Sequence, residues 1–428
     1  MKRIILKAQK NRKKSSIYSS DEYISDEDPD INLASHILNN RYICLFYLSK
    51  GGFSSVWVVY DTVDFDLKSA KVFHDNHEEF YNEKKIFEQI ITNDTKNIVR
   101  CYDIFEENSL MVIITELLGI SLLDVINDIY ENKYTLFVTN IKFMFRQIIN
   151  GFRELHNIGI IHADIKPDNI LLDILPHNIT TLNSILKELN IKDLYITIFN
   201  SLVPQDYNTF NKNKKKMVKR KIKMRTLKGI RDYLFEKNIF TKFEKKHTEN
   251  NIVMYNPKLI QEHRFNIKII DFSNSEFEDN ISQNEIYIRS YRPLENIINI
   301  NYTKKSEIWA IGCLFYEFLT GINLFEIKKR VNETEKNIDH LYNIFKTFTN
   351  QNYKEIVENS DFYDIFFSHR KLKIKNKYEV LDLRQKLIHN SIIELDIDEM
   401  YNFLSIFFIF NINLRPDCNI IMELPFFG

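Results

Sequence analysis

With 428 residues, and with 58 Lys plus Arg against 58 Asp plus Glu, the chain has no formal net charge at neutral pH. This balance excludes partners that are recognised by overall charge, whether nucleic acids or anionic membranes. Any such binding must come from a local patch. The length allows one large domain, or two lobes, with a substantial hydrophobic core.

Residues 1–35 are predicted to form a disordered tail. A basic run around Lys10 to Lys14 precedes the segment SSIYSSDEYISDEDPD, and neither stretch shows apolar periodicity. We expect a mainly solubilising tail. A nuclear-import signal in the basic run and phosphorylation at Ser25, which precedes three acidic residues, are the alternatives.

The cysteines and the apolar runs indicate a cellular compartment. Cys44, Cys101, Cys313 and Cys418 are far apart in apolar surroundings, which is typical of reduced thiols in an intracellular protein. Neither a secretory signal nor an apolar run of about 18 residues is visible, so we expect a soluble protein without a membrane partner. Nine glycines and abundant Asn, Ile and Lys fit an AT-rich source such as a large DNA virus, so a viral protein in a host cell is one alternative.

Residues 40–118 predict a small antiparallel sheet. Five short runs rich in β-branched and aromatic residues alternate with polar turns, namely RYICLFYL, SSVWVVYD, LKSAKVF, IVRCYDIFEEN and LMVIITELL. The segment EEFYNEKKIFEQI interrupts them with apolar residues at helical spacing. One helix is therefore expected within the sheet-forming region.

Residues 119–172 and 266–427 predict a mostly helical second region. Between these segments, residues 174–264 break the pattern, and ten Lys or Arg without an acid occur from Lys212 to Lys228. We interpret residues 174–264 as a basic insert with some helix. Because the basic run lacks an aromatic residue for base stacking, we expect at most weak nucleic-acid binding there.

The segment HADIKPDN places an acid, an ammonium group and an amide on one short turn. In a phosphoryl-transfer site, Asp164 would accept or orient the proton of the attacking hydroxyl, and Lys166 would neutralise charge on the transferred group. Asn169, together with Asp271 at the end of the strand-like IKIID, would bind Mg²⁺ through oxygen atoms.

The hairpin LSKGGFSSVW fits the pattern G-x-G-x-x-G-x-V, with serine at the first and third glycine positions. Small residues let the backbone approach the phosphates of ATP closely. The residues predicted to cover the nucleotide are Ser49, Lys50, Gly51, Gly52, Phe53, Ser54, Ser55 and Val56. An ordinary hairpin would show the same local pattern.

Lys71 in LKSAKVF is predicted to contact the α- and β-phosphates, with Ala70 beside it in the nucleotide site. The helix that follows offers three acids as partners for the Lys71 ammonium. We favour Glu83 over Glu78 and Glu79, because its neighbours keep it beside the apolar stripe.

The segment TELLG is predicted to border the adenine ring. Thr115 would lie at the back of the adenine pocket, and its small side chain predicts a roomy pocket. Glu116 to Leu118 would offer backbone groups to the base.

Taken in order, these motifs resemble eukaryotic-type protein kinases over about 295 residues, 40–172 plus 266–427. The resemblance implies an α+β, bilobal protein-kinase fold over residues 36–428, with ATP and Mg²⁺ as cofactors and protein Ser/Thr hydroxyls as substrates. It also implies that Arg415 pairs with Glu295 of the YRPLE segment.

Within that family the chain is similar to the SR-protein kinases of the CMGC group. Shared features are GGFSSVW, a long insert after NILL, a short activation segment with RSYRPLE, and TGINLF before DHLYNIF. This similarity implies arginine/serine-rich protein substrates. It assigns no oligomeric state.

Four positions depart from the kinase pattern. Ala163 replaces the arginine that reads a phosphorylated activation loop, Ser273 replaces a glycine, Ile288 replaces a threonine, and Glu307 replaces an aspartate. These departures leave a pseudokinase that acts as a binding scaffold as the alternative function.

Overall fold

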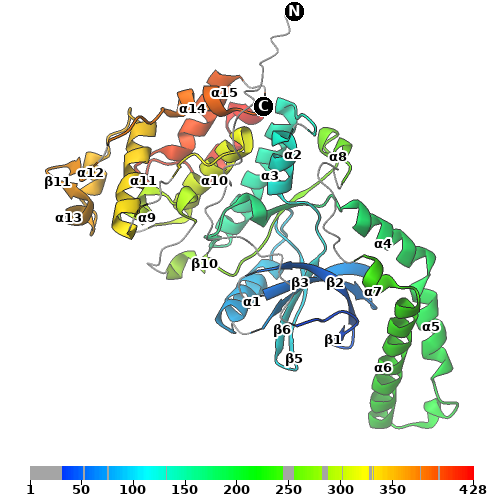
Figure 1. Ribbon diagram of the computed structural model, residues 1–428. Helices are drawn as coiled ribbons and strands as arrows, with labels where there is room; N and C mark the ends of the chain where they lie inside the picture. The colour runs from blue at the N-terminus through cyan, green and yellow to red at the C-terminus, as the bar shows by residue number, and fades with distance from the viewer. Residues whose placement is uncertain are drawn as a thin grey trace, which may run out of the picture.

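The computed structural model describes residues 31–51, 54–74, 77–131, 133–243, 255–281, 288–300, 302–326, 330, 332–375, 377–393 and 396–428. A sheet-based lobe and a larger helical lobe meet near the middle of the molecule (Figure 1). The predicted α+β, two-lobe fold is confirmed. Residues 1–30 of the predicted tail, and Gly52 and Phe53 of the hairpin, lie outside the described residues.

The N-terminal lobe is built on a six-stranded antiparallel sheet in the order β1-β2-β3-β4-β6-β5. Its strands are β1 (Ile37–Leu38), β2 (Tyr42–Lys50), β3 (Ser54–Asp61), β4 (Asp66–Phe73), β5 (Cys101–Glu107) and β6 (Leu110–Glu116). The predicted helix is α1 (His77–Ile91), whose Phe80 and Phe87 are buried in the main core with Phe73 of β4.

The two faces of this sheet have different neighbours because side chains alternate along each strand. On the outer face, Trp57 and Ala70 belong to a cluster that also buries Leu33. On the inner face, Val56 of β3 is directly opposite Lys71 of β4 in the strand register. The inner face therefore presents Lys71 toward the second lobe.

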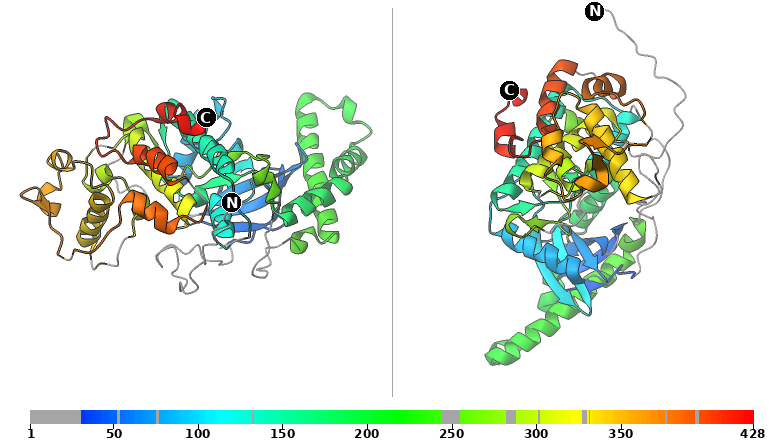
Figure 2. Two further views of the ribbon diagram at one scale, coloured as in Figure 1. Left: turned by 90° about the horizontal axis from the view of Figure 1, so that it is seen from above. Right: turned by 90° about the vertical axis from the view of Figure 1, so that its left-hand side faces the viewer.

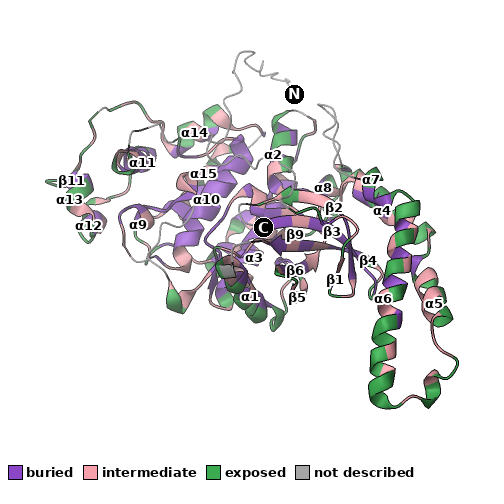
Figure 3. Ribbon diagram, turned by 60° about the horizontal axis from the view of Figure 1, so that its bottom comes forward, coloured by how far each residue is buried: buried purple, intermediate pink, exposed green. Residues whose placement is uncertain are grey.

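The C-terminal lobe is mostly helical, as predicted. Its elements before the insert are α2 (Leu122–Tyr130), α3 (Val138–Asn157), β7 (Ile160–Ile161) and β8 (Ile170–Leu172). Those after the insert are β9 (Ile267–Ile269), β10 (Glu276–Phe277), α9 (Leu294–Ile297), α10 (Lys304–Thr320), α11 (Glu333–Thr347), α12 (Lys354–Val357), α13 (Tyr363–Phe366), β11 (Phe367–Ser368), β12 (Lys371–Leu372), α14 (Leu383–Asn390), α15 (Ile397–Ser405) and α16 (Cys418–Met422). Helix α10 is apolar on nearly all sides and is buried at the centre of the lobe (Figure 3).

Residues 174–264 leave the lobe between two paired strands. β8 and β9 pair antiparallel, and Asp173 and Asn266 close the base of the excursion with backbone and side-chain hydrogen bonds of 2.8–3.0 Å. The described part of the excursion contains α4 (His177–Glu188), α5 (Ile191–Ser201), α6 (Lys212–Glu236), α7 (Ile239–Lys242) and α8 (Lys258–Gln261). It is thus more helical than the sequence indicated.

The insert is anchored on the N-terminal lobe. Ile230 and Leu234 of α6 share a buried cluster with Val58 and Tyr60 of β3 and Leu67 of β4. The other end of α6 and the adjoining α5 project away from both lobes (Figures 1 and 2). The boundaries predicted for tail, domain and insert stay predictions.

Within the described ranges, we find no helix with the length and apolar character that a bilayer crossing requires. All four cysteines are free thiols. Cys44, Cys313 and Cys418 are buried, whereas Cys101 is half-buried.

Candidate active site

Lys71 is the meeting point of three elements. Its Nζ donates hydrogen bonds of 2.7 Å to Oε2 of Glu83 on α1 and of 2.7 Å to Oδ1 of Asp271, which follows β9. The predicted pairing of Lys71 with Glu83 is confirmed. These contacts tie the sheet, helix α1 and the second lobe together at one ammonium group.

Within this trio, Lys71 and Asp271 each stabilise the charge of the other. Burial opposes the charge of Lys71, but the carboxylates of Asp271 and Glu83 outweigh it and raise the pKa of the ammonium. Burial likewise disfavours the Asp271 carboxylate, yet Lys71 and the Ser273 hydroxyl hold its pKa below the usual range. Burial and the neighbouring Asp271 raise the pKa of Glu83. Lys71 and Asp271 therefore stay charged at neutral pH.

The backbone of Asp271 adopts a left-handed conformation, with φ of 65°. This conformation is costly for a residue with a side chain, so neighbouring contacts must hold it. The Ser273 hydroxyl donates to Oδ1 of Asp271 at 2.9 Å. The ring of Phe272 packs edge-on against Phe87 of α1 and against His162, with centroids 5.3 and 5.5 Å apart.

Asn82 forms a contact with the segment after Asp271 that the sequence did not predict. Its Nδ2 donates to the carbonyl oxygens of Ser273 and Ser275, each at 2.9 Å. The segment after Asp271 is thereby fixed to α1, next to Glu83. The position of Asn82 directly before Glu83 is the one sequence signal that could have drawn attention to it.

The turn between β7 and β8 brings its three predicted site residues together. Asn169 Nδ2 donates to the backbone oxygen and to Oδ2 of Asp164, both at 2.9 Å. Lys166 Nζ lies 3.0 Å from the same Oδ2. Burial opposes the charge of Lys166, but Asp164 raises its pKa, so the Lys166 ammonium stays charged at neutral pH.

A buried glutamate holds this turn in place through a hydrogen bond to its backbone. Glu307 of α10 accepts a hydrogen bond from the backbone N–H of Ala163 at 2.9 Å, and its other oxygen lies 2.8 Å from Nε2 of His156. Burial disfavours a charged imidazole, but Cys418 and Glu307 raise the pKa of His156 to about 10. The longer side chain at position 307 therefore still reaches the turn that holds Asp164.

The hairpin between β2 and β3 is tight. Ser49 is opposite Val56 and Lys50 is opposite Ser55, and the N–H of Gly51 donates to the carbonyl of Ser54 at 2.7 Å. A Cβ atom on Gly51 would lie 3.1 Å from the Ser54 hydroxyl oxygen. A side chain at Gly51 would thus crowd the turn.

Two predicted nucleotide contacts point away from the site. The Ser55 hydroxyl lies 2.8 Å from Nε2 of His74 and accepts from the Trp57 indole at 3.0 Å. Ala70 is fully buried in the outer cluster with Trp57. Side chains alternate along a strand, so an offset of one residue changes the face. Ser69 and Lys71, on either side of Ala70, occupy the inner face.

The predicted adenine border follows the same alternation. Thr115 is opposite Ser69 and shares its inner face. The Glu116 side chain accepts a hydrogen bond from the backbone N–H of Arg100 at 2.8 Å, which fixes its position. Leu118 packs half-buried against the main core.

Two further predicted positions are packed within the helical lobe. Arg415 donates to both carboxylate oxygens of Glu295 at 2.7 and 3.1 Å, which confirms the predicted pairing, and both side chains are buried. Ile288 is half-buried against the main core and has no hydroxyl to offer Asp164.

The comparisons with known proteins agree on one family. The protein kinase domain family matches residues 47–181 and 176–427. The chain is similar to Dual specificity protein kinase CLK4 of Mus musculus, with 23% identity over 323 residues, 74% of this chain and 51% of the relative. Serine/threonine-protein kinase AFC1 of Arabidopsis thaliana is 25% identical over 312 residues, which are 71% of this chain and 51% of that protein.

Probable serine/threonine-protein kinase clkA of Dictyostelium discoideum is 23% identical over 316 residues, 71% of this chain and 27% of that protein. The chain thus spans about half, or less, of the length of the curated relatives it matches.

Proposed function

The chain belongs to the protein kinase family, which confirms the resemblance, and on this premise we propose that it transfers a phosphoryl group from ATP to serine or threonine hydroxyls of proteins. The observation that carries the proposal is the position of the Lys71 ammonium, 2.7 Å from both Glu83 and Asp271. A lysine held in this way offers a fixed positive charge to the phosphates of a nucleotide.

The donor set fits a magnesium–nucleotide complex. Asp271 offers a carboxylate, and Asn169 offers its amide oxygen, because its Nδ2 already donates twice to Asp164. In the described residues, no three His, Cys, Asp or Glu side chains gather as a metal cage. A magnesium ion would therefore depend on these two ligands, water and phosphate oxygens, as is usual for this ion.

Each group of the turn has a separate task in this proposal. Mg²⁺ and ATP supply the activated phosphoryl group. Asp164 orients the substrate hydroxyl and receives its proton, and Lys166 stabilises negative charge on the transferred group. Ser69, rather than Ala70, borders the adenine with Thr115, because both lie on the inner face. Backbone N–H groups of the hairpin cover the phosphates.

We propose arginine/serine-rich proteins as the substrate class. The likeness to SR-protein kinases supports this class. Asp168 adds support, because it interacts electrostatically with the carboxylates of Asp124 and Asp164 as well as with the Lys166 ammonium, so acids outnumber the base around this turn. A guanidinium group beside the target serine would be attracted there.

Phosphate transfer from labelled ATP with Mg²⁺ tests the proposal, using a Ser/Arg-repeat peptide and a generic acceptor protein. We expect transfer by the wild type and its loss in Asp271→Ala. Asp279→Asn is the matched control, since Asp279 is exposed and takes no part in the hydrogen bonds of Lys71. Equal transfer to both acceptors would contradict the arginine/serine preference alone.

A scaffold pseudokinase is the second candidate, and Ile288 is the observation that favours it, because the kinase pattern has at this position a threonine hydroxyl that orients the catalytic acid. Under this alternative, folded wild-type protein would bind ATP without transferring phosphate. Gain of transfer in Ile288→Thr would then identify the missing hydroxyl as the cause.

A further inference from the structure

The strongest uncompensated charge in the described chain is on α6. Ten Lys or Arg occur between Lys212 and Lys228 without an acid, and 16 helical steps of about 1.5 Å spread them over roughly 24 Å. Among the described residues, none of the ten forms an ion pair, and the first ion pair along α6 is Arg231 with Asp232. Such a density approaches that of a nucleic acid, about one charge per 1.7 Å.

The fold keeps this half of α6 accessible. Ile230 and Leu234 anchor the C-terminal part of the helix on the sheet, and α5 packs along it. Met217 is 53% exposed, and the projecting part of α6 is exposed over most of its surface (Figure 3). The arm projects away from both lobes (Figure 1). A ligand held on it would leave the catalytic trio free.

The cations form two rows on opposite sides of the helix. At 3.6 residues per turn, residues three, four and seven apart align along the axis. One row consists of Lys212, Lys216, Lys219 and Lys223. The other row consists of Lys214, Lys221, Arg225 and Lys228.

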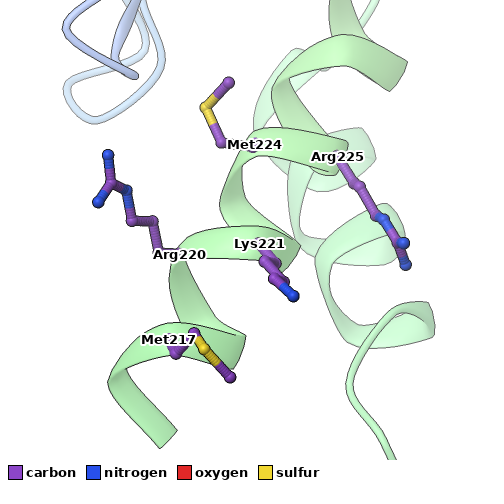
Figure 4. Close-up of a pocket in the computed structure, with 5 residues that line it drawn as sticks. All are labelled: Met217, Arg220, Lys221, Met224 and Arg225. Atoms are coloured by element: carbon purple, nitrogen blue, oxygen red, sulfur yellow. The ribbon is translucent and has the colours of Figure 1, made fainter. Parts of the chain in front are cut away.

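A ridge of two methionines and one arginine lies between the two rows. It consists of Met217, Arg220 and Met224, again three and four residues apart. An open hollow of about 500 Å³ follows this surface and is lined by Met217, Arg220, Lys221, Met224 and Arg225. Arg220 and Arg225 extend to opposite sides of the helix, with Lys221 between them (Figure 4).

From this arrangement we propose that α6 binds double-stranded DNA by lying in the major groove. The groove is about 12 Å wide, admits one α-helix, and has a row of phosphates along each wall. The two cationic rows face these walls, and the Met–Arg ridge faces the base edges at the floor. The deep, narrow major groove of A-form RNA does not admit such a helix.

Other polyanions match the surface less well. A membrane-bound helix needs a broad apolar face, whereas Met217 is the sole large apolar residue that is strongly exposed between positions 212 and 228. An acidic protein would not require two rows on either side of a ridge. The proposal is independent of the kinase activity, so either can fail alone.

Fluorescence anisotropy with the full chain and a labelled 20-bp DNA duplex, between 50 and 200 mM salt, tests the proposal. Two triple variants neutralise the rows separately, Lys216→Gln with Lys219→Gln and Lys223→Gln, and Lys214→Gln with Lys221→Gln and Arg225→Gln. Each phosphate contact contributes about 0.9 to the slope of log affinity against log salt. We expect each variant to lower the slope by about 2 to 3 and the affinity at least tenfold.

The matched control neutralises three exposed lysines outside α6, Lys258→Gln with Lys354→Gln and Lys371→Gln, and should change the affinity less than twofold. Thermal melts and phosphate transfer to a generic acceptor should be unchanged in both row variants, which excludes misfolding. Wild-type affinity in the row variants would overturn the proposal. So would tighter binding of single-stranded RNA, or equal competition by polyglutamate.

Discussion

Lys71 in the cleft lies 2.7 Å from two carboxylates, whereas Lys221 on α6 has no acidic partner in the described part of the chain. Both are lysines of a protein without net charge. The cleft holds its cation in a fixed place for one small ligand, because two buried acids orient it. On α6, repulsion among neighbouring cations remains until an outside polyanion relieves it. The zero net charge of the chain therefore does not reveal that its lysines have two different roles, one paired with acids in the cleft and the other unpaired on α6.

The largest expected effect comes from removing the paired cation. Lys71→Met should lower phosphate transfer by about 10²- to 10³-fold, the usual effect of losing a preorganised electrostatic contact. Lys221→Met, the matched change on α6, should leave transfer to a generic acceptor within twofold. Steady-state kinetics on both variants checks the comparison. Full activity in Lys71→Met would show that the trio does not serve transfer.

The same comparison between paired and unpaired cations can be made for stability, with the buried ion pair of Arg415 and Glu295. Glu295→Gln leaves Arg415 buried without its counter-charge, so the free energy of unfolding should fall by about 3 kcal/mol. Arg225→Gln on α6 should change it by no more than about 0.5 kcal/mol. Urea denaturation of the two variants measures both values. A loss below about 1 kcal/mol in Glu295→Gln would contradict the buried-pair interpretation.

The free energy of unfolding should also depend on pH, because His156 is paired with Glu307 in the folded protein. The pKa of His156 is raised to about 10 in the folded protein, against about 6.5 in an unfolded chain. Its stabilising contribution is therefore fully present below pH 6.5 and is lost as the pH rises from 6.5 through about 10. The free energy of unfolding, measured at pH 6, 8 and 10, should decrease by at least about 1 kcal/mol more in the wild type than in His156→Gln. Parallel pH profiles would disprove the assignment.

The smallest effect is expected at Ser273. Ser273→Ala removes one hydrogen bond to Oδ1 of Asp271, and a bond of about 1 kcal/mol corresponds to a few-fold change. We expect a two- to tenfold increase in the Mg²⁺ concentration that gives half-maximal transfer. Asn274→Ala, at an exposed neighbour, is the control. An unchanged Mg²⁺ titration would mean that Lys71 alone positions the carboxylate.

The cleft illustrates what sequence patterns can and cannot locate. Asp164, Asn169 and Asp271 could be predicted because acidic and amide residues at fixed spacing on a turn and a strand end are unusual. Ala70 was misplaced because strand direction was known but the face was not, and one residue of offset reverses the face. Asn82 escaped notice because its partners are backbone carbonyls almost 200 residues away. No local pattern reports such a contact.

The sequence itself determined the order of the motifs, the division into two lobes and the ten cations of α6. Residue types and the local spacing of apolar residues are properties of the chain. Which partners those residues acquire was decided only by the tertiary structure. Folding brings Glu83 and Asp271 to Lys71, although the sequence separations are 12 and 200 residues. The same packing buries one end of α6 and leaves its cations accessible. Whether a charged side chain is neutralised depends on its distance in space from an opposite charge, and packing sets that distance.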